Sequence, residues 1–221
     1  MDKKYLNIPI PMLKELHIDN KKFFNDSLDV GIYLYSQTLK GAEEKCYRAA
    51  LKYLGITHGN IQGGIDTAKQ VLYSMPKKYP LVGIEKEMLF DYYKNDKDDF
   101  DIACLGAFLG IKSILGKKPY CKTNKALIHA RMFGYTTAKE LPDKLTSLQQ
   151  KYQYRRQMDK ILIELQMNWF LKTISNHQRG MMISFDLSFD ELAVIIEKNK
   201  QQTKIQQLRE MKREAISNAK N

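Results

Sequence analysis

The stretch SLQQKYQYRRQMDKILIELQMNWFLKTISNHQRGMMISFD, residues 147–186, joins a helical pattern to a hairpin pattern. A helix from about Ser147 to Asn168 is predicted by apolar residues at offsets 0, +3, +4, +7 and +11, namely Met158, Ile161, Leu162, Leu165 and Trp169. Its first half, residues 149–157, is almost wholly polar or aromatic and is expected to project from the core. A short run at 170–174, a polar tip at 175–180 and the alternating apolar residues Met181, Ile183 and Phe185 then predict a β-hairpin over 170–186.

Two more helices are predicted before this stretch. Apolar residues recur at helical spacing from Phe100 to Leu115, and Gly116 follows where a left-handed cap would end the helix. Thr123 or Asn124 can cap a second helix, which runs to Gly134. Three helices followed by a hairpin are typical of a winged helix, in which the third helix enters the DNA major groove and the wing reaches the backbone or the minor groove.

The residue pattern resembles winged-helix DNA-binding domains, most closely those of plasmid and phage replication initiators. The resemblance lies in AFLGIKSILGKKPYCKTNKALIHARMFG, residues 107–134, and in YRRQMDKILIELQMNWFLK, residues 154–172, which is similar to the family's recognition helix. It covers less than half of the 221 residues. The stretch 135–146 departs from the pattern, because a tight helix-turn-helix needs only a few residues there.

The N-terminal half repeats the order of elements. Helices are predicted at 24–39, 42–54 and 60–75, with a shortened wing at 77–84 and a preceding strand or extended arm at 5–11. This long period indicates duplicated domains, although any helical protein yields three helices in such a length. The expected fold is therefore mainly α with small β-hairpin wings, an α+β class. Tandem winged-helix domains would occupy 1–95 and 96–187.

The remaining residues, 188–221, are predicted to form a charged C-terminal helix. Ser188 and Glu191 have the spacing of a capping box at its start. Beyond its first turns the segment is polar and charged, which fits a free helix, a dimerisation arm or a phosphate-binding tail.

Positive charge is concentrated in one part of the chain. The 36 Lys and Arg residues against 25 Asp and Glu residues give a net charge of +11. Residues 117–160 hold 11 basic and 3 acidic side chains, a net of +8, whereas residues 1–95 contribute only +3. A polyanion is therefore the expected partner of this stretch, with a solvated face of helices as the alternative.

Candidate DNA contacts follow from side-chain chemistry. Arg155 and Arg156 can bond guanine, and Gln153 or Gln157 can bond adenine. Other contacts are expected with phosphates or by stacking, from Lys151, Tyr154 and Lys160 on the third helix and from Lys117, Lys118, Lys122 and Lys125 around the start of the second. At the wing tip, His177 and Arg179 are candidates for the minor groove. The alternative is that all of these are solvated surface residues.

No catalytic, metal or cofactor site is expected. The histidines and the three cysteines lack zinc-ligand spacing, and no P-loop is present. Cys121 beside Lys122 has no positioned histidine, so it is not expected to be a nucleophile. The odd, widely spaced cysteines indicate reduced thiols. The longest apolar run, 102–111, is half of what a bilayer requires, and no secretory signal is visible, so a cytoplasmic protein without membrane contact is expected.

By this reasoning the chain is a non-enzymatic, sequence-specific, double-stranded DNA-binding protein. The resemblance implies a replication initiator, whose partners would be DNA and either a second copy of the chain or replication proteins. A transcriptional regulator of the same fold, or a scaffold that uses winged helices to bind proteins, are the alternatives.

Overall fold

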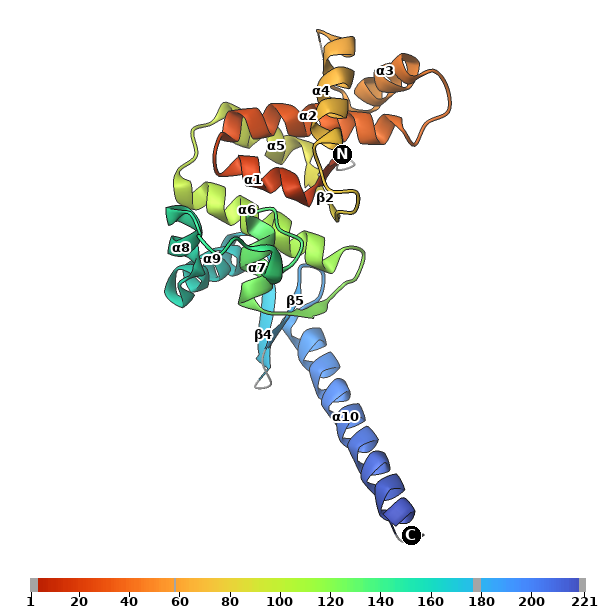
Figure 1. The fold of residues 1–221 in the computed structure, drawn as a ribbon, viewed down its shortest axis with the longest axis vertical. Helices are drawn as coiled ribbons and strands as arrows, with labels where there is room; N and C mark the ends of the chain where they lie inside the picture. The colour runs from red at the N-terminus through yellow and green to blue at the C-terminus, as the bar shows by residue number, and fades with distance from the viewer. Residues whose placement is uncertain (1–3, 58, 177–179, 219–221) are drawn as a thin grey trace.

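The computed structural model describes residues 4–57, 59–176 and 180–218. Over these residues the chain is mainly helical with two small antiparallel sheets, which confirms the α+β class (Figure 1). An N-terminal half and a C-terminal half each surround a hydrophobic cluster, and a long helix leads away from them.

The N-terminal half is built on a strand that comes first in the chain. Its elements are β1 (Tyr5–Pro9), η1 (Ile10–Met12), α1 (Leu13–Leu16), α2 (Asn20–Ser36), α3 (Glu43–Leu54), α4 (Ile61–Tyr73), β2 (Leu81–Glu85) and α5 (Lys86–Lys94). The three predicted helices correspond to α2, α3 and α4. The predicted strand near residue 5 is confirmed as β1.

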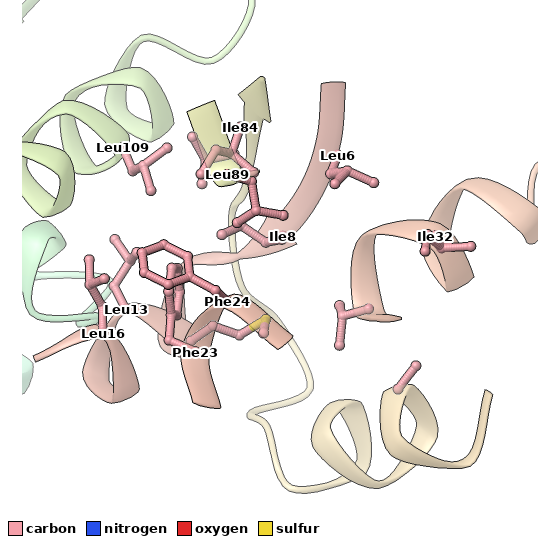
Figure 2. Close-up of a cluster of buried hydrophobic side chains, with 14 of the residues drawn as sticks. Leu6, Ile8, Leu13, Leu16, Phe23, Phe24, Ile32, Ile84, Leu89 and Leu109 are labelled. Carbon is pink, nitrogen blue, oxygen red and sulfur yellow. The ribbon is translucent and has the colours of Figure 1, made fainter. Parts of the chain in front are cut away.

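The predicted wing at 77–84 is wrong. β2 is a single strand that pairs antiparallel with β1, with Tyr5 opposite Glu85 and Pro9 opposite Leu81. Alternate residues of both strands are buried, so this long-range pairing closes the core in place of a local hairpin. Figure 2 shows their Leu6, Ile8 and Ile84 gathered with residues of α1, α2, α5 and α6.

The C-terminal half contains the second, three-stranded sheet. Its elements are α6 (Asp99–Leu115), β3 (Cys121–Thr123), α7 (Lys125–Met132), η2 (Ala138–Glu140), α8 (Ser147–Gln153), α9 (Arg155–Asn168), β4 (Lys172–Asn176) and β5 (Gly180–Ser184). The predicted first and second helices and the hairpin are confirmed as α6, α7 and β4–β5. The sheet order is β3-β5-β4, and no strand was predicted at the position of β3.

The single helix predicted over 147–168 is wrong. Tyr154 is extended, with φ −63° and ψ 130°, and divides α8 from α9. α8 buries Tyr152, whereas α9 buries Met158 and the apolar residues after it. In a straight helix six residues would place Tyr152 and Met158 about 120° apart, whereas with the break at Tyr154 both pack in the C-terminal cluster.

α6 belongs to both halves. Ile102, Leu105 and Leu109 pack in the N-terminal cluster, while Ala103 and Ile111 on other faces of the helix pack in the C-terminal cluster. The predicted boundary between residues 95 and 96 therefore precedes a helix that both cores share.

A second junction joins the halves through α1. The Nε2 atom of His17 lies 3.0 Å from the carbonyl oxygen of Met132, and its ring centroid lies 4.5 Å from that of Phe133. Gly134 follows with φ 78°, where a Cβ atom would lie 2.8 Å from the backbone nitrogen of Lys14. The close approach of α1 to the end of α7 thus requires glycine.

The C-terminal helix, α10 (Phe189–Asn218), projects from the rest of the chain (Figure 1). Its predicted capping box is confirmed, because the backbone N–H of Ser188 donates to Glu191 at 2.8 Å and that of Glu191 donates to Ser188 Oγ at 3.3 Å. Leu192 and Ile196 pack against Met182 of β5. Among the described side chains, those after Ile196 are exposed. Within the described ranges, each helix is either too short or too polar to cross a bilayer.

Candidate nucleic-acid interface

The beginnings of α7 and α9 are held together by one carboxylate. Asn124 caps α7, accepting a hydrogen bond of 2.8 Å from the backbone N–H of Leu127, and Lys125 follows as the first helical residue. Lys125 forms a close ion pair with Asp159 on α9. The Nε atom of Arg155 lies 3.7 Å from the other oxygen of Asp159. The two helices therefore present their basic first residues side by side.

A cavity of about 420 Å³ lies between these helix ends. Lys125 and Arg155 contribute its cationic groups. The other lining residues are Ala126, His129, Leu141, Tyr152, Gln153 and Met158. The lining of the hollow therefore combines two cations with mainly apolar side chains.

His129 and Tyr152 build the floor of this hollow. The Nε2 atom of His129 lies 2.8 Å from the carbonyl oxygen of Gln149, which fixes α8 against α7, and burial lowers the pKa of His129. Thr146 and Gln149 form a capping box at the start of α8. The hydroxyl of Tyr152 donates to the carbonyl oxygen of Asp99 at 3.4 Å. These contacts determine where α8 ends and therefore where α9 begins.

The charges at these helix starts oppose ordinary helix stabilisation. A helix N-terminus carries a partial positive charge, so acidic side chains stabilise it and cations cost about 0.3–1 kcal/mol each. α3, α6 and α10 have acidic residues in their first turns. α7 and α9 have none there and begin with Lys125, Arg155 and Arg156, and α2, with Lys21 and Lys22, is similar. A bound anion would reverse this cost, because it would meet the cations and the helix N-terminus together.

Most of the predicted residues of the third helix lie in this region. Arg155, Arg156 and Lys160 are exposed on α9, and Gln157 is half-buried. Lys151 is exposed on α8, with its Nζ atom 5.2 Å from the centroid of the Tyr152 ring. Gln153 ends α8 and Tyr154 follows it, and both are exposed, Tyr154 by 70%.

The predicted lysines near β3 fall into two groups. Lys122 lies beside the first residue of β5, since a Cβ atom at Gly180 would lie 3.3 Å from its Cε atom. Lys117 and Lys118 lie before the opposite end of β3, where Ser184 Oγ donates to the carbonyl oxygen of Pro119 at 2.6 Å. Lys117 and Lys118 therefore precede one end of β3, whereas Lys125 follows the other end.

The predicted wing-tip residues His177 and Arg179 lie outside the described residues. Arg131, which contributes to the +8 of residues 117–160, is half-buried against Gly110 of α6 and is not part of the surface group. Burial lowers the pKa of Arg131.

Sequence reasoning missed two residues that shape the interface. Asp159 stands four residues after Arg155, a spacing that signals a helical ion pair, but its contact with Lys125 is set by tertiary packing. His129 is buried and lines the cavity, and its position there depends on its contact with α8, which the sequence did not separate from α9.

No family model, curated protein or solved structure matches this chain.

Proposed function

We propose that residues 99–184 form a winged helix that binds double-stranded DNA with α9 in the major groove. The observation that carries this proposal is the pair of arginines, Arg155 and Arg156, exposed at the start of a helix beside Lys125. Cations at a helix N-terminus reduce helix stability, and among the described residues Asp159 alone faces Lys125 and Arg155 in the free protein, so a bound polyanion would add the stabilisation that Asp159 does not supply. The order of α6, β3, α7, α9 and the β4–β5 hairpin supports the proposal as well.

In this proposal the position of each side chain determines whether it contacts a base or a phosphate. Arg155 and Arg156, at the start of α9, reach guanine O6 and N7 or a nearby phosphate, and Gln153 and Gln157 flank them. Phosphate contacts come from the lysines around them, Lys122, Lys125, Lys151 and Lys160. Four such contacts correspond to a slope of about −3.6 in a plot of log K against log salt concentration. Lys117 and Lys118 are left out of the contact surface.

The role in replication rests on the resemblance to plasmid and phage initiators. A transcriptional regulator of the same fold would use the same surface. The two roles differ in the DNA they require, because repeated direct sites favour an initiator and a short palindrome favours a dimeric regulator. Selection of bound duplexes from a random pool therefore separates them.

A protein-binding scaffold is the second candidate. The observation that favours it is α10, which exposes Val194, Ile205 and Leu208 as it leaves the body. A second copy of the chain or a replication protein would be the partner. These partners would bind away from α9, so a scaffold would tolerate the loss of Arg155 and Arg156.

A mobility-shift titration tests the proposal. Arg155→Ala/Arg156→Ala should weaken binding to the selected duplex at least about 30-fold, since each bidentate contact is worth about 1–3 kcal/mol. The matched control is Lys45→Ala/Lys52→Ala, which removes two exposed cations from α3. It should change affinity less than about threefold. Equal binding by the arginine variant, or no binding of any duplex by the natural protein at low salt, would refute the proposal.

A further inference from the structure

The outward face of α9 is half cationic and half apolar. At about 100° per residue, the side chains of Arg156, Lys160, Ile163 and Met167 fall within about 60° of one another. They lie opposite the buried stripe of Met158, Ile161, Leu162 and Leu165. Ile163 is 57% exposed and Met167 is 77% exposed. The four residues thus form one row along the helix, which we call the α9 outer row.

The apolar part of this row has no role in the core of the chain. α9 already buries its own stripe, and a polar residue at position 163 would leave that stripe intact. The two cations in the same row determine the kind of partner. An apolar protein surface would have to desolvate Arg156 and Lys160, whereas the duplex offers phosphates to cations and apolar groups to isoleucine.

The major groove contains one apolar group, the C5-methyl of thymine. We infer that Ile163 contacts this methyl group and makes the protein select an A·T pair at one position of its site. This inference rests on the proposed function, because it requires α9 to lie in the major groove.

The helix geometry places that base pair. Seven residues separate Arg156 from Ile163, a rise of about 10.5 Å along α9. At 3.4 Å per base pair this corresponds to about three base pairs. The selected site should therefore show a thymine about three pairs from the position that depends on Arg156.

Met167 provides a control within the same row. It lies in the last turn of α9, one residue before the helix ends at Asn168. A recognition helix contacts base edges mainly with its N-terminal part, so the last turn is the part farthest from them. Met167→Ala removes more exposed apolar surface than Ile163→Ala but should not alter base preference.

Uracil, which is thymine without the methyl group, tests the contact directly. A duplex selected from a random pool by the natural protein is prepared with each thymine replaced singly by uracil. One replacement should weaken binding of the natural protein about fourfold, as expected for one methyl group returned to water. Ile163→Ala should bind the thymine and uracil duplexes equally, whereas Met167→Ala should keep the fourfold difference. Circular dichroism confirms that both variants fold.

Other outcomes overturn the inference separately from the proposed function. If the natural protein binds the duplex but tolerates every uracil, or if Ile163→Ala keeps the discrimination, the contact with thymine does not exist although DNA binding stands. If Met167→Ala alone loses the discrimination, the contact belongs to a different residue. If no duplex is bound, the proposed function fails and the inference fails with it.

Discussion

His17 makes the contact between the two halves sensitive to pH. Its Nε2 atom lies 3.0 Å from the carbonyl oxygen of Met132, so the proton of the neutral ring must be on Nε2, where it donates to that carbonyl. The Nδ1 atom is buried and has no hydrogen-bond partner among the described residues. A second proton would therefore place a charge on a buried atom that has no acceptor among the described residues. Burial accordingly lowers the pKa of His17 from 6.5 to about 4, outweighing the hydrogen bond to Met132.

The sign of the effect follows from where the proton binds. Between pH 6.5 and about 4 the unfolded chain protonates at His17 while the folded chain does not, so acid favours the unfolded state. The contribution of neutral His17 to the free energy of unfolding is complete above pH 6.5 and is lost as the pH falls toward 4. One pKa unit corresponds to about 1.4 kcal/mol, so the full loss is about 3 kcal/mol and the loss by pH 5 is about 2 kcal/mol.

Urea unfolding at pH 7.5 and pH 5 measures this loss. The natural protein and His17→Gln are compared, and the difference between the two pH values should be about 2 kcal/mol smaller in the variant. His129, whose pKa burial also lowers, is present in both proteins and cancels in the comparison. An equal pH dependence in the two proteins would refute the reasoning, because His17 would then be free to protonate in the fold.

Three further predictions concern the interface, the C-terminal helix and the junction. Asp159→Asn should raise the affinity for duplex DNA about threefold in fluorescence anisotropy. A carboxylate about 7 Å from a phosphate costs about 0.6 kcal/mol in water, and its loss also frees Lys125 and Arg155. Unchanged or weaker binding would contradict this prediction. A chain that ends after Lys200 should keep its free energy of unfolding within about 0.5 kcal/mol, since the described side chains beyond that point are exposed, and urea unfolding would show any larger loss. Gly134→Ala should reduce the free energy of unfolding by about 1–3 kcal/mol and so lower the melting temperature, because the φ of 78° and the close neighbours exclude a Cβ atom. An unchanged melting temperature would show that the junction can relax.

Local signals predicted the elements whose boundaries are local. Asn124 at the start of α7 and Gly134 after its end identified that helix. The capping box of Ser188 and Glu191 identified the start of α10, and alternation identified the β4–β5 hairpin. In each case the residues that set the boundary of the element lie within a few positions of it, so a short stretch of sequence is enough to predict that boundary.

The features that were missed depend on partners far along the chain. β2 pairs with β1 from the other end of the N-terminal half, and β3 is three residues long, too short for alternation to be visible. The break at Tyr154 arises because Tyr152 is anchored at Asp99 while Met158 faces the core from α9. In the candidate interface, the contact of Lys125 with Asp159 likewise joins residues from different elements. The residue types of the interface could therefore be predicted, but not their grouping.

The salt dependence of DNA binding tests the central claim most directly. Two variants are compared with the natural protein on the selected duplex, each with four exposed or partly exposed lysines changed to glutamine. The interface variant changes Lys122, Lys125, Lys151 and Lys160, and the control variant changes Lys45, Lys52, Lys77 and Lys78. In a plot of log K against log salt concentration, the interface variant should lose about 3.6 from the magnitude of the slope and the control should lose less than about 0.5. Equal losses, or a larger loss in the control, would show that α7 and α9 do not form the DNA-binding surface.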